Sequence, residues 1–472
     1  MPTATATAVR QADVVILGAG LAGLTCAVIA ARTGASVLLL EKLEKLGGST
    51  VLSGGSIAFT ETEEQRAENV ADSVARFRAD LVESADRPEA AELIDTYLEH
   101  QGEAYRFLKD LGIVFGPMQS AARQSAPRSH PTDPYALIER LASELARMPN
   151  ATLLRSAKAL RLHRDDGGRV TGVSYEHGGA RSMAQARRGV VLATGGFSRD
   201  EELLDLFAPR LKVSRRTGGE GSTGDGTRMA LEMGAIMADL DILLPTFGCL
   251  DEEGTSEPNT ILLPMYKGGI AIDKRGKRFA NESLPYKTIG RIALDIPGAV
   301  GFQIFDDAVM RKSAKQPKTY DFKRALDLGR VIAADSIEAL ADKIHVDPAV
   351  LKATLDKYNE DVAQAGVDSV FGRAALVHTQ GAPFPLVSAP FYAYPTATFI
   401  AGTWGGVRIN RHMQMLDVWH EPIPGLYGAG EVTGGIHGKS YMTGTALGKA
   451  VIFGMLAGRA ASAGQVSPQR FA

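Results

Sequence analysis

Cysteine is almost missing from this chain: Cys26 and Cys249 are the only two among 472 residues. Two thiols so far apart in sequence argue against a disulfide scaffold, a structural zinc site and a cysteine-ligated iron–sulfur cluster. Neither lies in the CxxCH context that attaches a haem. We therefore predict no metal site, and any redox chemistry requires a bound cofactor of another kind.

The sequence also lacks a strong net charge and long apolar runs. Its formal net charge of −2 gives no electrostatic reason to expect a nucleic acid or a membrane surface as partner. No apolar stretch approaches the roughly 20 residues that span a bilayer. The N-terminus "MPTATATAVRQA" has no charged and apolar regions of a secretory signal. We expect a cytoplasmic globular protein with two or three folding units.

The first fifty residues contain a clear alternation of apolar runs and glycines. "DVVILGAG" (Asp13–Gly20) is a buried strand that ends in glycines, and the following segment has Leu21, Leu24 and Val28 at helical spacing before Gly34. "ASVLLLEK" is a second buried strand. Strand, turn, helix and strand in this order predict a βαβ start and an α/β fold.

Composition further divides the chain into three parts. Residues 1–240 contain the βαβ start, amphipathic helices and later strands such as "RVTGVSYEH" and "RRGVVLATGG". Residues 241–389 shift toward loops and helices with Pro, Lys and Asp, which indicates an inserted second domain. Residues 390–472, with "GGVRIN", "GLYGAGE" and a final apolar helix, are predicted to return to the first domain.

The strand-to-helix turn carries a dinucleotide fingerprint. Gly18, Gly20 and Gly23 fill GxGxxG between a strand and a helix, and Glu41 follows at the end of the next strand. The glycines permit a tight turn, the helix N-terminus faces a pyrophosphate, and the carboxylate accepts ribose hydroxyls. A plain glycine turn is the alternative.

Three more glycine-rich segments follow. "GGSTVLSGGSIAF" (Gly47–Phe59) offers small donors for a ligand larger than NAD, or is a flexible surface loop. "VVLATGGFSRD" is a buried strand that ends in Thr-Gly-Gly. In "GSTGDGTRMALEMGA", Asp225 either contacts the ligand or only caps a helix.

In this order, "GAGLAG", "GGSTVLSGG", "ATGG", "GDG", "RGKRFANE" and "GLYGAGEVTGGIHG" cover nearly the whole chain. The chain resembles the flavoproteins that include fumarate reductases, succinate dehydrogenase flavoprotein subunits and 3-ketosteroid dehydrogenases. The resemblance implies a Rossmann-like FAD-binding domain (GR2-type) interrupted by an α+β capping domain, with substrate between the cap and the flavin. Relatives with covalent flavin carry a histidine where this chain has "GGST", so noncovalent FAD is expected.

The resemblance also implies individual cofactor contacts. Glu41 would bind the adenosine ribose, residues 157–159 would supply backbone near the adenine, and Glu431 would reach a ribityl or ribose hydroxyl. His437 would contact the cofactor rather than move protons. The full set is Gly18, Gly20, Gly23, Glu41, Lys42, Gly48, Ser49, Thr50, Ser53, Gly54, Gly55, Ala159, Thr194, Gly195, Asp225, Glu431, His437, Ala446 and Leu447.

The substrate end differs from that of the fumarate reductases. A dicarboxylate needs arginines and histidines, yet Tyr286 and Tyr441 stand where those relatives have arginines. "AGTWGG", with Trp404, replaces their "HHTMGG". These departures point to a less charged, apolar substrate.

The same residues resemble those of 3-ketosteroid dehydrogenases, which implies their roles. Tyr286 would remove the α-proton, and Tyr441 with the amide of Thr445 would hold the ketone oxygen while hydride leaves the β-carbon for flavin N5. Trp404 either lines the flavin or packs a core. Without the resemblance, Tyr286 is an ordinary packing tyrosine, and a shift of one residue would give the role of Tyr441 to Ser440.

Together these features predict an FAD-dependent α,β-desaturase of a cyclic ketone: a monocyclic ketone such as cyclohexanone or 4-oxocyclohexanecarboxylate, or a 3-ketosteroid. A reductase of an activated alkene is the alternative, and a non-catalytic FAD protein is a third class. The electron acceptor, whether oxygen, a quinone or a carrier protein, stays open. "RSH" (Arg128–His130) is either close to the substrate pocket or a polar surface turn.

Overall fold

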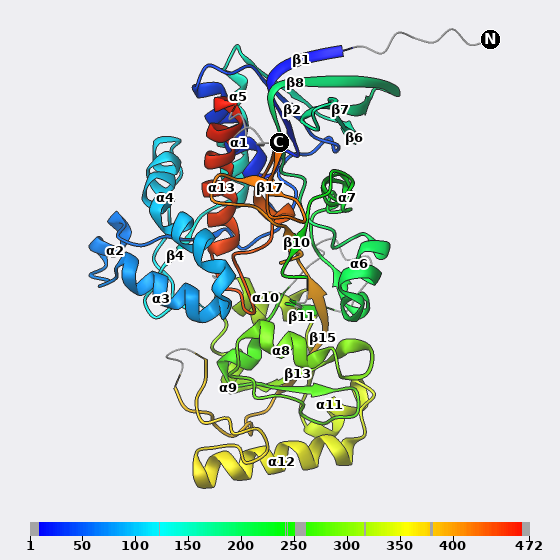
Figure 1. Cartoon of the computed structure of the whole chain (residues 1–472). Coiled ribbons are helices and arrows are strands. Elements are labelled where there is room, and N and C mark those ends of the chain that lie inside the picture. The colour runs from blue at the N-terminus through cyan, green and yellow to red at the C-terminus, as the bar shows by residue number, and fades with distance from the viewer. Residues whose placement is uncertain are drawn as a thin grey trace, which may run out of the picture. The chain divides into compact units, whose positions relative to one another are not determined.

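The computed structural model describes residues 9–121, 123–240, 242, 244–250, 261–315, 318–377 and 381–464. They form two compact units, coloured by chain position in Figure 1. The first unit takes the described residues within Met1–Ala208, Gly218–Ile242 and Ala401–Ala472. The second takes those within Pro209–Thr217 and Leu243–Ile400.

An eight-stranded sheet forms the centre of the first unit. Its main path runs β17 (Gln414–Leu416), β18 (Pro422–Gly428), β8 (Ala180–Leu192), β1 (Val9–Leu17), β2 (Val37–Leu40) and β5 (Ala151–Leu154). The pairs among β18, β8, β1, β2 and β5 are all parallel, whereas β17 is antiparallel. β6 (Ala157–Arg164) and β7 (Val170–His177) extend β8 as an antiparallel arm. The apolar runs of β1 and β2 are buried because parallel strands are covered on both faces.

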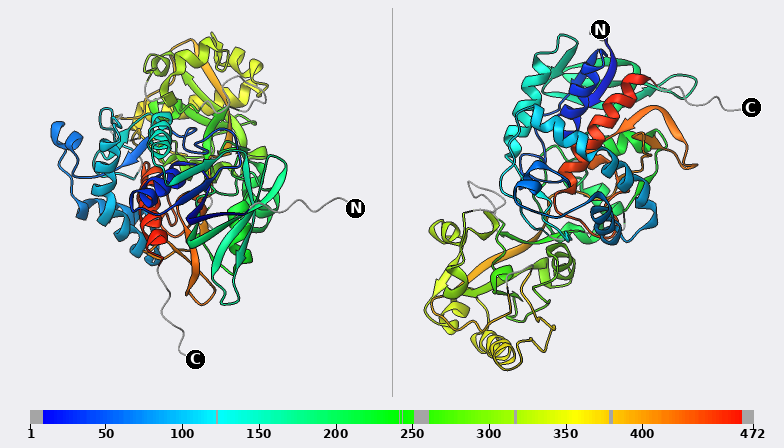
Figure 2. Two further views of the ribbon diagram at one scale, coloured as in Figure 1. Left: turned by 90° about the horizontal axis from the view of Figure 1, so that it is seen from above. Right: turned by 90° about the vertical axis from the view of Figure 1, so that its left-hand side faces the viewer.

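The first and last helices of the chain pack together against this sheet. α1 (Leu21–Arg32) lies beside α13 (Thr445–Ala463), as the blue and red ribbons of Figure 2 show. Two glycines of α13 allow this approach: a Cβ at Gly454 or at Gly458 would lie 2.6 Å from the carbonyl oxygen of Ala22 or Cys26. The βαβ start is therefore confirmed, and α13 lies in the first unit.

Shorter elements complete the first unit. They are β3 (Ser56–Ala58), α2 (Glu63–Ala67), α3 (Val74–Ala85), η1 (Pro88–Ala90), α4 (Ala91–Asp110), β4 (Ser129–Pro131), α5 (Pro134–Ala146), α6 (Glu201–Phe207), α7 (Asp225–Glu232), β10 (Met237–Ala238), β16 (Gly406–Val407) and η6 (Gly430–Val432).

The second unit is built on a six-stranded sheet. Its path runs β11 (Thr246–Leu250), β15 (Phe391–Ile400), β13 (Val300–Asp306) and β12 (Ile270–Asp273), and β14 (Ile332–Ala334) and β9 (Arg215–Arg216) also pair with β15. The helical elements are η2 (Pro209–Val213), η3 (Pro264–Lys267), α8 (Tyr286–Ala293), η4 (Pro297–Ala299), α9 (Asp307–Met310), η5 (Lys318–Tyr320), α10 (Phe322–Asp327), α11 (Ile337–Lys343) and α12 (Pro348–Ala365).

The limits of these compact units differ from the domain limits that the sequence suggested. β15 lies beyond residue 389, yet it pairs with β13 along Val300–Asp306 and so belongs to the sheet of the second unit. Pro209–Thr217 also joins that unit, where β9 pairs with the end of β15. The domain limits given above remain predictions. Among the helices of the described residues, none is both long and apolar enough to cross a membrane.

Candidate active site

Two glycines of the turn after β1 leave no room for a side chain. Gly18 has φ +99°, and a Cβ there would lie 2.4 Å from the Ala193 carbonyl oxygen. A Cβ at Gly23 would lie 1.8 Å from the Gly18 carbonyl oxygen. Gly20 precedes α1 and provides no side-chain cap. The turn brings the N-terminus of α1 next to backbone without a side-chain cap, an arrangement that suits a pyrophosphate.

Glu41 holds the shape of this turn. It follows β2, is 9% exposed, and its two carboxylate oxygens accept the amides of Ala19 at 2.8 Å and Leu43 at 2.9 Å. A carboxylate has about four lone-pair sites, so these two bonds leave acceptor capacity for ribose hydroxyls. The amide of Ala157, at the start of β6, in turn donates to the Glu41 carbonyl at 2.8 Å.

The second glycine loop joins three distant segments through one serine. The Ser49 hydroxyl donates to Glu431 at 3.1 Å and accepts the Gly219 amide at 3.2 Å. Glu431 also accepts the Thr403 amide at 3.0 Å. Burial raises the pKa of the Glu431 carboxyl, against the lowering effect of these hydrogen bonds. Glu431 is thus fixed between the loop and the C-terminal segment.

The rest of this loop is ordered by its own side chains. Thr50 Oγ1 accepts the Leu21 amide at the start of α1 at 3.3 Å. Ser53 donates to the Thr50 carbonyl at 2.7 Å and accepts the Gly55 amide at 3.2 Å. Gly48 has φ +49°. A Cβ at Gly54 would meet nothing within 4 Å, so only part of the loop requires glycine for packing.

Lys42 and Asp225 form an ion pair at 2.6 Å. Lys42 Nζ also donates to the Thr223 hydroxyl at 2.5 Å. Asp225 is the first residue of α7, whose N-cap is Gly224 in the left-handed region, so Asp225 is not the cap that the alternative reading required. Its carboxylate instead connects the start of α7 to the residue after Glu41.

Thr194 supplies an observation that fits a missing ligand. Its hydroxyl oxygen is buried and has no hydrogen-bond partner among the described residues. The neighbouring Gly195 has φ +76°, and a Cβ at Gly226 would lie 2.0 Å from the Thr194 hydroxyl. Buried hydroxyls normally have a hydrogen-bond partner, so this hydroxyl fits a site that a ligand completes.

Ala159, which was predicted to lie near the adenine, is in β6 and pairs with Tyr175 of β7.

The start of α13 presents backbone amides. Gly444 precedes it with φ +94°. The amide of Thr445 donates to the Met442 carbonyl at 3.2 Å, and the Thr445 hydroxyl donates to the same oxygen at 2.7 Å. Ala446 and Leu447 lie in the first turn, where amides have no intrahelical carbonyl. The amide of Thr445, the proposed donor to the ketone, thus already donates to the Met442 carbonyl. The amides of Ala446 and Leu447 are the next two along the first turn of α13.

Three rings of the first unit lie together, and we call Trp404, His437 and Tyr441 the aromatic cluster. The ring centres of Trp404 and Tyr441 are 4.3 Å apart, those of Trp404 and His437 5.2 Å, and those of His437 and Tyr441 5.6 Å. Burial lowers the pKa of His437 well below its usual range, so the imidazole is neutral. The cluster is therefore aromatic and uncharged.

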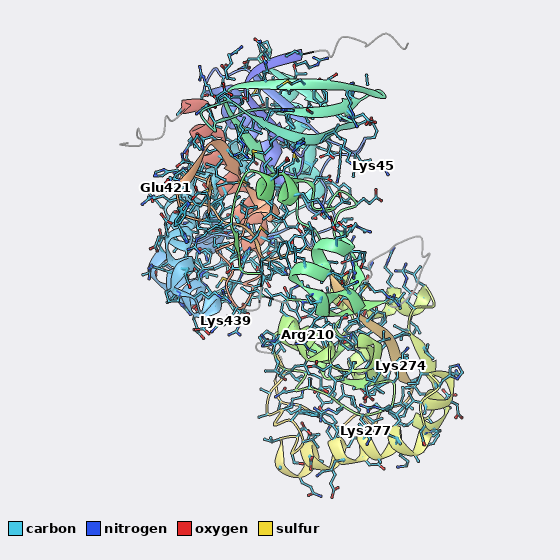
Figure 3. All side chains as sticks on the ribbon, turned by 45° about the vertical axis from the view of Figure 1, so that its right-hand side comes forward. Lys45, Arg210, Lys274, Lys277, Glu421 and Lys439 are labelled. Atoms are coloured by element: carbon cyan, nitrogen blue, oxygen red, sulfur yellow. The ribbon has the colours of Figure 1, made fainter. Side chains whose placement is uncertain are left out.

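Nearby basic side chains are occupied elsewhere. Lys449 donates to the Thr433 carbonyl at 2.7 Å, and burial lowers its pKa to about 8. Lys439 pairs with Asp86 at 2.8 Å and lies at the surface, where Figure 3 labels it. The Tyr441 hydroxyl accepts the amide of Gly444 at 3.1 Å.

Tyr286 lies in the second unit, as the first residue of α8, and is half-buried. The loop before it is held by a buried ion pair, in which Arg278 donates to both oxygens of Glu282 at 2.8 and 2.7 Å. Arg278 also pairs with Asp368 at 2.7 Å. Arg373, itself fully buried, lies 3.4 Å from Glu282. Sequence reasoning missed this role, although "RFANE" contains the pair at i, i+4 spacing.

The segment Arg128–His130 is buried, so the surface-turn interpretation is wrong. Arg128 pairs with Asp72 at 2.7 Å and with Asp80 at 2.5 Å. His130 Nε2 lies 2.8 Å from the Thr62 hydroxyl. These bonds give the segment a structural role within the first unit.

The chain is similar to known proteins in sequence and in fold. Residues 13–447 match the family model described as "FAD binding domain". The chain is 30% identical over 431 residues to the probable fumarate reductase Ifc3 of Shewanella frigidimarina (strain NCIMB 400), covering 89% of this chain and 70% of that protein. It is 31% identical over 445 residues to the acrylate reductase flavoprotein subunit of Shewanella woodyi, covering 90% and 86%.

A solved structure is similar over its whole length. The 3-ketosteroid-Δ4-(5α)-dehydrogenase from Rhodococcus jostii RHA1, in complex with 4-androstene-3,17-dione, has a TM-score of 0.77 and 28% identity, covering 98% of this chain and 99% of that one. The glycine turn, the Glu41 carboxylate and the unpartnered Thr194 hydroxyl fit the FAD that these similarities imply.

Proposed function

Because this chain belongs to the FAD-binding flavoprotein family of the fumarate reductases, we propose that it is a dehydrogenase that desaturates a cyclic ketone next to the carbonyl. It is a flavin oxidoreductase of a family that acts on CH–CH or C=C groups. The substrate class is the proposal: a monocyclic ketone of the cyclohexanone or 4-oxocyclohexanecarboxylate type, or a 3-ketosteroid.

The FAD is proposed to be noncovalent. The loop after β2 reads "GGST" and offers no histidine for attachment. When bound, FAD supplies the acceptor for a hydride, that is, for one proton together with two electrons. Residues Gly18, Gly20, Gly23, Glu41 and Ser49 would hold it, through the backbone and side-chain groups described above.

One observation carries the proposal: the Tyr441 hydroxyl accepts the Gly444 amide at the start of α13. Because the Tyr441 oxygen accepts the Gly444 amide, the hydroxyl proton of Tyr441 can be donated to a different group. The positive end of a helix favours negative charge beside it, so this phenol is a strengthened hydrogen-bond donor. Such a donor suits a ketone oxygen on which negative charge develops.

The proposed reaction balances with one base and one hydride acceptor. Tyr286, as phenolate, removes a proton from the α-carbon, and the C–H electron pair moves toward the carbonyl, where Tyr441 stabilises the enolate oxygen. Bound FAD would supply the acceptor for the hydride that leaves the β-carbon as the C=C bond forms. The Tyr286 phenol later returns its proton to solvent, and an external oxidant removes the two electrons.

The aromatic cluster supports an uncharged ring as substrate. Binding and protonating a dicarboxylate requires cationic side chains. Here Trp404 lies against Tyr441, and the neighbouring imidazole of His437 is neutral. Flat aromatic faces favour an apolar ring, because burying apolar surface stabilises binding by about 25 cal/mol per Å².

An anaerobic substrate screen tests the proposal. The FAD-loaded protein is mixed with cyclohexanone, 4-oxocyclohexanecarboxylate, a 3-ketosteroid and succinate, and flavin bleaching is followed. We expect bleaching by at least one cyclic ketone and none by succinate. Bleaching by succinate alone would overturn the substrate class.

A reductase of an activated alkene is the second candidate. The similarity to a probable fumarate reductase and to an acrylate reductase subunit favours it, because both names describe reduction of a C=C bond. This enzyme would be bleached only by an external electron donor and reoxidised by an enone or enoate. The same anaerobic experiment, extended with dithionite and these acceptors, separates the two directions.

A further inference from the structure

We propose that Lys287 is a positioning residue for Tyr286: its ammonium group, held beside the phenol ring, stabilises the phenolate that acts as base. This inference rests on the proposed function, in which Tyr286 removes the α-proton. Sequence reasoning identified no group that would activate this tyrosine. Lys287 follows it directly at the start of α8.

Lys287 is buried, unlike most lysines of the second unit. Its side chain is 5% exposed, whereas Lys274 and Lys277 extend from the surface after β12 (Figure 3). Nζ donates to the Leu244 carbonyl at 2.9 Å. A buried lysine is uncommon, since burial disfavours its charged form. The fixed hydrogen bond keeps the amino group inside the unit rather than letting it reach solvent.

The amino group lies beside the tyrosine ring. Lys287 Nζ is 5.5 Å from the ring centre of Tyr286. Phenolate charge spreads into its ring, and at an effective dielectric constant of about 20 an ammonium at this separation attracts it appreciably. Tyr286 also occupies the first turn of an eight-residue helix, where the helix dipole favours negative charge. Both effects act in the same direction.

The charge of Lys287 depends on pH. Burial lowers the pKa of Lys287 to about 7. Near neutral pH the amino group is therefore partly protonated, and its ammonium form lies beside the Tyr286 ring. Removing the cation would leave the phenolate without this partner.

Other titratable groups near this helix are held neutral or point elsewhere. Burial raises the pKa of Tyr266, which donates to the Leu284 carbonyl at 3.0 Å, and of Tyr320, beneath the Lys267 ammonium at 4.3 Å. The Cys249 thiol of β11 donates to the Leu250 carbonyl. Arg291, one turn further along α8, is exposed. Among the described residues, Lys287 is a cationic side chain that lies against the Tyr286 ring.

The test compares the FAD-loaded wild type with Lys287→Met and Lys287→Arg. Methionine keeps the apolar stem without charge, and arginine keeps the charge. The anaerobic rate of flavin bleaching by the ketone found in the screen is measured from pH 6 to 10. We expect Lys287→Met to lose at least tenfold in rate near neutral pH and to move its half-maximal rate upward by about one pH unit or more. Lys287→Arg should keep most of the wild-type rate and most of the wild-type pH dependence.

A second readout needs no substrate. The ultraviolet absorbance of tyrosinate is titrated in each protein, and the same titration of its Tyr286→Phe derivative is subtracted. We expect the remaining transition to move to higher pH in Lys287→Met. An unmoved transition, or an equal loss of rate at every pH, would overturn the inference. Failure of every ketone to bleach the wild type would instead overturn the proposed function, and the titration would still decide the role of Lys287.

Discussion

The Tyr441 hydroxyl accepts a hydrogen bond from the Gly444 amide at 3.1 Å, which connects a phenol to the first turn of α13. The 19-residue helix α13 packs against α1, beside the glycine turn. The orientation of the phenol therefore depends on the same helix that packs beside the predicted cofactor site.

Tyr441→Phe removes the proposed donor while keeping the ring against Trp404. We expect FAD to remain bound and the bleaching rate to fall by about 10²–10³-fold, the usual effect of losing one oxyanion donor. Rapid-mixing kinetics under anaerobic conditions measure this. Ser440→Ala is the matched control, because a register shift would give the role to Ser440; a larger loss in that variant would contradict the assignment to Tyr441.

Gly23→Ala is expected to unfold the first unit or abolish FAD binding. Its Cβ would lie 1.8 Å from the Gly18 carbonyl oxygen, so the turn and α1 must separate. Gly102→Ala, within α4, is the control: its Cβ would meet only the Arg106 guanidinium at 3.9 Å. That change should stabilise the protein by about 0.5–1 kcal/mol. Thermal unfolding and FAD content measure both, and equal behaviour of the two variants would contradict this packing.

Arg278→Met breaks the buried ion pair before α8. Removing Arg278 takes the paired cation from the buried Asp368 and leaves Glu282 with Arg373 at 3.4 Å, and we expect a loss of about 3–5 kcal/mol in the free energy of unfolding. Arg210→Met is the control, because Arg210 and Asp295 are 50% and 74% exposed in their ion pair, and exposed pairs contribute about 0–1 kcal/mol. Denaturant unfolding compares them; similar losses would show that the buried cluster does not hold this loop.

His437 should make the FAD-free protein less stable in acid. Its pKa is lowered in the folded state by burial, so below about pH 6.5 the unfolded chain binds the proton and the folded chain does not. Folding stability then falls by about 1.4 kcal/mol per pH unit as the pH drops further. His437→Gln lacks this titration. The difference in unfolding free energy between the two proteins, measured from pH 7.5 to 5, should grow toward acid; a constant difference would contradict a buried neutral imidazole.

Local signals made the first unit predictable. Val14–Leu17 and Val37–Leu40 are short apolar runs separated by a glycine turn and a segment with helical spacing. This pattern is typical of a βαβ unit. The pairing of β15 with β13 could not be predicted from local sequence, because the apolar pattern of a strand does not show which sheet the strand joins. The same limit hid the contact between Lys287 and the Tyr286 ring.

The site was predictable only in part, for a related reason. Motifs name the residues at a glycine turn, but hydrogen bonds made between distant segments decide what each side chain does. Ser49 with Glu431, and Lys42 with Asp225, are such bonds. Arg128 resembled a surface residue because its partners, Asp72 and Asp80, lie far back in the sequence.

Anaerobic reduction of the enzyme flavin by a cyclic ketone tests the central proposal most directly. Cyclohexanone, 4-oxocyclohexanecarboxylate and a 3-ketosteroid are each mixed with the FAD-loaded protein in the absence of any other electron donor. The account predicts bleaching by at least one of them and formation of the matching α,β-unsaturated ketone. Bleaching only by an external donor, followed by reoxidation with an enone or a dicarboxylic enoate, would contradict it.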